Sequence, residues 1–218
     1  MIRLDATDAG FATAFDALVD ARRETAVDVA RDVGVIIRSV RDEGDAAVRA
    51  FTQKLDRHDL DETGWRIDAA ACRAAFEGLD PELAGALGLA AARIRAWHER
   101  QRPADTEFTD EAGVRLGARW RAVDAAGIYV PGGRAAYPST LLMNAIPARV
   151  AGVERLVVVT PTPDGEVNPL VLAAAHLARA DEVWRIGGAQ AIAALAFGTE
   201  RIARVDVVTG PGNAWVAE

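Results

Sequence analysis

The sequence contains little cysteine and histidine, and these shortages exclude several kinds of site. Cys72 is the one cysteine among 218 residues, so an intrachain disulfide is excluded, which is consistent with a reducing compartment. Its alanine-rich neighbours predict a buried helical cysteine. The three histidines, His58, His98 and His176, form no H-x-x-H or H-E-x-x-H motif, so the sequence predicts no zinc site within this chain. His58 lies in the charged run Asp56–Asp61, which we expect to be a solvated loop.

Positive charge and long apolar runs are also scarce. The formal net charge is −7, arginine supplies every basic residue except Lys54 and the histidines, and no basic run occurs, so nucleic acid is not an expected partner. No apolar stretch is long and uncharged enough to cross a bilayer, and the N-terminus shows no basic segment followed by an apolar one. We therefore expect a cytoplasmic globular protein with no membrane partner.

The first part of the chain has the pattern of consecutive helices. Gly44 predicts the end of one helix, directly before a second helix at Asp45–Lys54. Asp80 predicts the start of another helix, Pro81–Arg100, with proline at its first position. Mixed polar and apolar residues near 106–120 predict a short hairpin.

From about residue 122 onward, short apolar runs alternate with stretches rich in alanine and leucine. The predicted strands are Gly127–Val130, Leu156–Thr160, Val183–Ile186 and Val205–Val208. The predicted helices are Ser139–Val150, with Ser139 as the N-cap, Pro169–Arg179 and Ala189–Phe197. This alternation predicts parallel βαβ units, and strands that are almost wholly apolar predict a sheet covered on both faces.

We therefore predict an α/β fold in two parts. Residues 1–123 form a mainly helical region, part of a first and incomplete α/β domain. Residues 124–218 form an incomplete Rossmann-like parallel sheet with helices on both faces, truncated at its C-terminal end.

A turn rich in glycine or proline follows each predicted strand, and the carboxyl edge of such a sheet is where ligands bind. The turns contain Gly132 and Gly133, Gly188, and Gly212, where backbone amides can approach a phosphate closely. Turn geometry explains any single one of these glycines equally well. Four such turns along one edge make a nucleotide or phosphate ligand as good an explanation as turn geometry, and a dinucleotide pyrophosphate is the natural candidate, although the G-x-G-x-x-G fingerprint is absent.

Three polar side chains accompany these turns, and each has a structural alternative to ligand binding. Tyr129 lies within the end of the first predicted strand and could be a packed tyrosine with a satisfied hydroxyl. Gln190 begins a helix, where a solvated amide would be ordinary. Asn213 precedes the last helix, where capping explains it. Their convergence on one edge favours a binding role.

Several longer motifs resemble those of histidinol dehydrogenases. They are GIYVPGGRAAYPSTLLMNAIPARVAGV (127–153), NPLVLAAAH (168–176), RIGGAQAIAALAFGTE (185–200), GPGN (210–213) and VRDEGDAAV (40–48). The resemblance implies a zinc-dependent homodimer that oxidises L-histidinol to L-histidine through an aldehyde with two NAD⁺. It also implies that Tyr129, Gln190 and Asn213 contact NAD.

The family's chains run on for about as long again, and that half supplies the zinc ligands and a Glu-His pair for proton transfer. The resemblance therefore implies that the zinc-ligating and catalytic residues lie outside this chain. We expect a truncated fragment that is inactive alone and binds NAD⁺ weakly. The alternative is a non-catalytic nucleotide-binding or assembly module derived from that enzyme.

Overall fold

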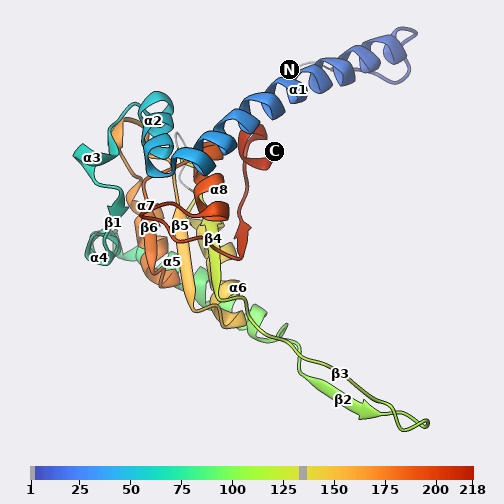
Figure 1. Cartoon of the computed structure of the whole chain (residues 1–218), viewed down its shortest axis with the longest axis vertical. Helices are drawn as coiled ribbons and strands as arrows, with labels where there is room; N and C mark the ends of the chain where they lie inside the picture. Colours follow the sequence, from blue (N-terminus) through green and yellow to red (C-terminus); the bar gives the residue numbers. More distant parts are fainter. Residues whose placement is uncertain (1–2, 133–136) are drawn as a thin grey trace.

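A five-stranded sheet forms the centre of the fold (Figure 1). The computed structural model describes residues 3–132 and 137–218, without the side chains of residues 20–27. The strands of this sheet are β1 (Arg66–Ile67), β4 (Ala125–Tyr129), β5 (Arg155–Val159), β6 (Glu182–Trp184) and β7 (Val207–Thr209). Their order is β1-β6-β5-β4-β7, and all neighbours are parallel except β1, which pairs antiparallel with β6.

Helices cover both faces of the sheet. One face carries α1 (Phe11–Glu43), α2 (Asp45–Asp56) and α8 (Gly188–Phe197). The other face carries α4 (Ala69–Glu77), α5 (Pro81–Glu99), α6 (Pro138–Ala151) and α7 (Pro169–Ala178). Short helical turns are α3 (Leu60–Thr63), η1 (Pro163–Gly165) and α9 (Ala214–Ala217). The predicted α/β class is confirmed.

Burial on both faces explains the apolar strands. Along β4, Ala125 and Tyr129 pack into the core beneath α1, α2 and α8, whereas Ala126 and Ile128 pack into the core beneath α6 and α7. Successive side chains of a strand point to opposite faces, so in a strand covered on both sides all side chains are buried and apolar residues are favoured at every position. Each of the two hydrophobic cores contains residues from before and after position 123. The division of the chain into two parts at this position stays a prediction.

Local details differ from the sequence predictions. The observed strands β4, β5, β6 and β7 are each shifted by one or two residues from those predicted. Strand β1 was not predicted, because a two-residue strand is defined by its pairing with β6 and not by a pattern of its own. The prediction of Ser139 as an N-cap was wrong: Pro138 is the first residue of α6, so Tyr137 occupies the cap position.

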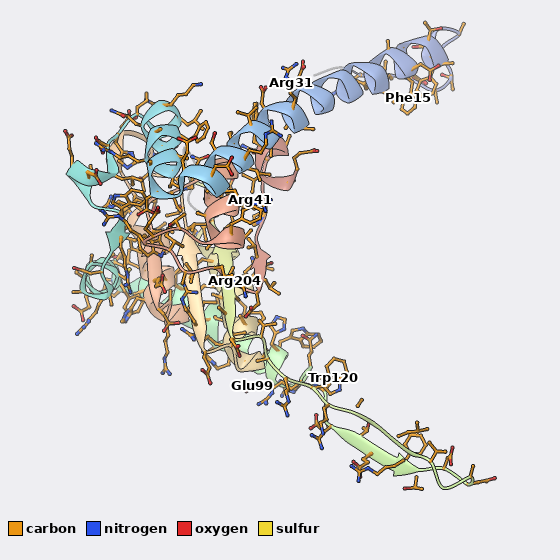
Figure 2. The ribbon with its side chains drawn as sticks, viewed as in Figure 1. Phe15, Arg31, Arg41, Glu99, Trp120 and Arg204 are labelled. Carbon is orange, nitrogen blue, oxygen red and sulfur yellow. The ribbon has the colours of Figure 1, made fainter. Side chains whose placement is uncertain are left out.

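Two segments project from the body (Figure 1). The C-terminal part of α1 buries Val33, Ile36 and Val40, but its N-terminal part extends away, with Phe15 near the far end (Figure 2). The predicted hairpin is confirmed: β2 (Thr106–Thr109) pairs antiparallel with β3 (Arg115–Ala118) and points away from the sheet. All residues of both hairpin strands are exposed.

Strand β4 is the point from which the chain adds strands first on one side and then on the other. From β4 the chain runs through α6 to β5 and through α7 to β6 on one side, and then returns through α8 to β7 on the other side of β4. The turn after β4 leads to α6 on one face, whereas the turn after β7 leads to α9, which contacts α1 and α8 on the other face. The two turns therefore diverge. Such a switch point is the usual ligand position in open α/β sheets.

Candidate functional site

A cavity of about 660 Å³ lies at this carboxyl edge. Its size is within the range of small-molecule and cofactor sites. The turns after β4, β5, β6 and β7 line it together with α1 and α2. Of the predicted site residues, those that line the cavity are Tyr129, Gly132, Gly188, Gln190 and Asn213. Gly212 is not among the lining residues but directly precedes Asn213 in the sequence. Gly133 lies outside the described residues.

Tyr129 joins two of these turns. Its side chain is 5% exposed, and its phenolic oxygen accepts a hydrogen bond from the backbone amide of Gly188, with 3.2 Å between oxygen and nitrogen. Burial raises the pKa of the phenol, while the Gly188 amide acts to lower it. Tyr129 is therefore protonated at neutral pH, and its own O–H can donate to a group in the cavity.

Gln190 is buried, so the alternative that its amide is solvated was wrong. It is the third residue of α8, its exposed fraction is 1%, and it lines the cavity. Its Oε1 is buried and has no hydrogen-bond partner in the described part of the chain. A buried amide oxygen without a partner costs free energy, so this atom is well placed to accept a bond from a ligand.

Asn213 has the capping role considered for it. Its Oδ1 accepts a hydrogen bond from the backbone amide of Trp215 at 3.1 Å, which begins α9. Because that cap uses the oxygen, the amide nitrogen is the group with which Asn213 could contact a ligand.

Close packing within the chain explains two of the glycines at this edge. A Cβ on Gly132 or on Gly187 would overlap Pro161, in the turn after β5. These glycines therefore let the turns after β4, β5 and β6 touch, and this contact narrows the edge into a cavity. Gly188 has φ +61°, and a Cβ there would lie 2.6 Å from Gln190 Oε1.

The charged run that begins at Asp56 was predicted to be a solvated loop, and for Asp56 and His58 this was wrong. Both side chains are 8% exposed. The loop folds against the turn after β5, where His58 Nε2 lies 3.2 Å from Thr162 Oγ1 and Arg57 forms a two-pronged ion pair with Asp164. Asp56 lines the cavity, and burial raises the pKa of its carboxyl group, against the lowering effect of the Thr162 amide. Sequence reasoning missed it because a charged run usually indicates solvent.

The other candidates have structural roles. Cys72 is buried on α4, as predicted, and burial raises the pKa of its thiol. The ring of His176 packs against that of Phe76 in a tilted arrangement, with 5.5 Å between the ring centroids. Within residues 3–132 and 137–218, no three His, Cys, Asp or Glu side chains form a group that could hold a metal ion. In the same residues, no helix combines the length and apolar character needed to cross a membrane.

These features define an α/β protein with a cavity at the switch point of a mainly parallel sheet, the usual position of a ligand site. Comparison with known proteins agrees with the motifs of the sequence: a family profile described as histidinol dehydrogenase matches residues 20–218. The chain belongs to the histidinol dehydrogenase family.

Individual relatives support this assignment. A histidinol dehydrogenase of Zymomonas mobilis is 60% identical over 218 residues, which is 100% of this chain and 51% of that protein. One of Rhodospirillum rubrum is 56% identical over 216 residues, covering 99% of this chain and 50% of that protein. The crystal structure of histidinol dehydrogenase from Elizabethkingia anophelis superposes with a TM-score of 0.81 at 34% identity, covering 86% of this chain and 43% of that one. The chain thus spans about half the length of the curated relatives.

Proposed function

We propose that this chain is the NAD-binding half of a cytoplasmic enzyme that oxidises L-histidinol to L-histidine, the last steps of histidine biosynthesis. The observation that carries the proposal is the buried Oε1 of Gln190, which has no partner among the described residues and lies in the same cavity as Tyr129 and Asn213. In this proposal residues 124–218 form the NAD-binding domain, and the helical region before it supplies α1 and α2 as further walls.

The residues of the cavity fit a dinucleotide. Bound NAD supplies the hydride acceptor for each oxidation. Gln190 accepts a hydrogen bond through Oε1, Tyr129 donates its phenolic proton, and Asn213 donates through its amide nitrogen. Ile36, Phe51 and Leu55 add apolar lining, which excludes water from a nucleotide base.

Zinc does not fit the described residues, because they contain no suitable group of ligands. We assign the zinc ligands and the proton-transfer pair to the part of the longer relatives that this chain does not match. The purified 218-residue chain should then show no turnover with L-histidinol and NAD⁺, and measurable NADH formation by it would contradict this assignment.

We propose further that the protein acts as a homodimer, to which the projecting hairpin contributes. A lone two-stranded hairpin has little stability in water, yet Phe108 and Leu116 are 60% and 44% exposed on it. Sedimentation should show concentration-dependent self-association. Leu116→Ser should weaken it, whereas Leu89→Ser, at a 53% exposed position on α5, should not. Equal behaviour of the two variants would remove the hairpin from the interface.

The NAD-binding proposal is tested by titrating the chain with NAD⁺, using a method suited to weak affinity. Gln190→Leu keeps the side-chain size but removes the acceptor, so NAD⁺ affinity should fall about tenfold. Gln53→Leu makes the same exchange at an exposed position of α2 outside the cavity and should leave affinity unchanged. Failure of the unaltered chain to bind NAD⁺, or equal affinity in both variants, would contradict the proposal.

A further inference from the structure

Asp56 carries an unusual carboxylate. It is the last residue of α2, and it lines the same cavity as Tyr129 and Gln190. Its exposed fraction is only 8%. Its Oδ2 is buried and has no hydrogen-bond partner in the described residues. Burying a carboxylate oxygen without a donor is costly, and the cost is removed when a ligand supplies donors.

The neighbouring basic residues stabilise the charge of Asp56 only from a distance. Arg57 and His58 act to lower the pKa of its carboxyl group, but burial outweighs them. Arg57 is bound to Asp164 at 2.8 and 2.6 Å, and His58 faces Thr162. Lys54 and Asp32 also line the cavity, but no ion pair links Asp56 to a cation among the described residues. The charge of Asp56 contributes to raising the pKa of Tyr129, so the two groups lie within electrostatic reach of one another.

The position of Asp56 in the sheet points to a particular ligand group. Among the parallel strands β4 comes first and β5 second, and in dinucleotide-binding sheets an acidic residue near the end of the second strand binds the adenosine ribose. Here the turn after β5 begins Thr160, Pro161, Thr162, and its two acidic residues, Asp164 and Glu166, are both exposed. Asp164 is also paired with Arg57. Asp56 approaches this turn from α2, where the Thr162 backbone amide interacts with its carboxylate.

Resting on the proposed NAD site, we propose that Asp56 binds the 2′ and 3′ hydroxyls of the adenosine ribose and so selects NAD over NADP. A carboxylate only accepts hydrogen bonds, and a vicinal diol supplies two donors to it. A 2′-phosphate would bring negative charge against the same buried oxygen and is repelled. The acid normally supplied by the second strand thus comes from a helix of the N-terminal region.

The test compares the affinities of the 218-residue chain for NAD⁺ and NADP⁺. The unaltered chain should prefer NAD⁺, and Asp56→Asn should lower NAD⁺ affinity about tenfold and narrow the preference by a similar factor. Asp42→Asn removes the same charge from an exposed position of α1 outside the cavity and should change neither value. Thermal melting of each variant verifies that it is folded.

The outcomes separate the two proposals. If the chain binds NAD⁺ but accepts NADP⁺ equally well, or if Asp56→Asn leaves the preference unchanged, the role of Asp56 is wrong and the NAD site stands. If the unaltered chain binds neither nucleotide, both proposals fall.

Discussion

The phenolic oxygen of Tyr129 lies 3.2 Å from the amide nitrogen of Gly188 and accepts its hydrogen bond. This contact ties the end of β4 to the first residue of α8, across the opening between two strand-end turns. The same hydroxyl can therefore order the turn and face a ligand.

Tyr129→Phe should lower both stability and NAD⁺ affinity. The Gly188 amide would lose its acceptor, which costs about 1 kcal/mol in the free energy of unfolding. NAD⁺ affinity should fall severalfold because the phenolic donor is lost. Tyr137→Phe, at a 42% exposed position, is the matched control for chemical denaturation and nucleotide titration. An unchanged NAD⁺ affinity in Tyr129→Phe would count against a contact with the ligand.

Variants of Asn213 should separate capping from binding. Asn213→Asp keeps the oxygen that accepts from Trp215 but removes the amide donor, so α9 should persist while NAD⁺ affinity falls. Asn213→Ala should lose both the cap, worth about 1 kcal/mol to the helix end, and the affinity. Hydrogen exchange at α9 and nucleotide titration measure the two effects. If Asn213→Asp binds NAD⁺ as tightly as the unaltered chain, Asn213 is only a cap.

Much of this site could be predicted from the sequence, because the carboxyl ends of neighbouring parallel strands must share an edge. That rule predicts that Tyr129, Gln190 and Asn213 lie near one another, and all three line the same cavity. The burial of Asp56 could not be predicted, because it depends on a loop that contacts Thr162, and the partners His58 and Thr162 are 104 residues apart. Charge pattern alone does not show that such a loop is covered. The short strand β1 could not be predicted for the same reason, since its partner β6 is distant in the sequence.

Gly44→Ala should destabilise the junction of α1 and α2 more than an ordinary glycine substitution. Gly44 has φ +57° and lies against the carboxylate of Glu200, whose Oε2 accepts a hydrogen bond from the Asp45 amide at 2.8 Å. Alanine would add backbone strain of roughly 1–3 kcal/mol and displace that carboxylate. Gly64→Ala is the control, because Gly64 has φ +85° but open space around its Cβ position.

Chemical denaturation measures the difference between these two variants. Gly44→Ala should lose about 1 kcal/mol more than Gly64→Ala, corresponding to the broken hydrogen bond. In a Glu200→Ala background this excess should vanish. An excess that persists there would show that Glu200 is not its cause.

Asp56→Asn should make the unliganded chain relatively more stable as the pH rises. Burial raises the pKa of Asp56 in the folded chain, so between its ordinary value of about 4 and the folded value the unfolded chain loses the proton first. Stability contributed by Asp56 therefore declines through this interval, and asparagine does not share the decline. The difference in unfolding free energy between Asp56→Asn and the unaltered chain should grow from pH 4 toward neutrality. A difference that shrinks over this range would contradict the burial of an unpaired carboxylate.

The most direct test of the proposed NAD site is nuclear magnetic resonance of the isotope-labelled chain during titration with NAD⁺. The backbone amides of Gly188 and Asn213 and the side-chain amide of Gln190 should shift together and follow one binding curve. Resonances around Cys72, on the opposite face of the sheet, should stay unchanged. Shifts confined to other parts of the chain, or none at saturating NAD⁺, would contradict the account.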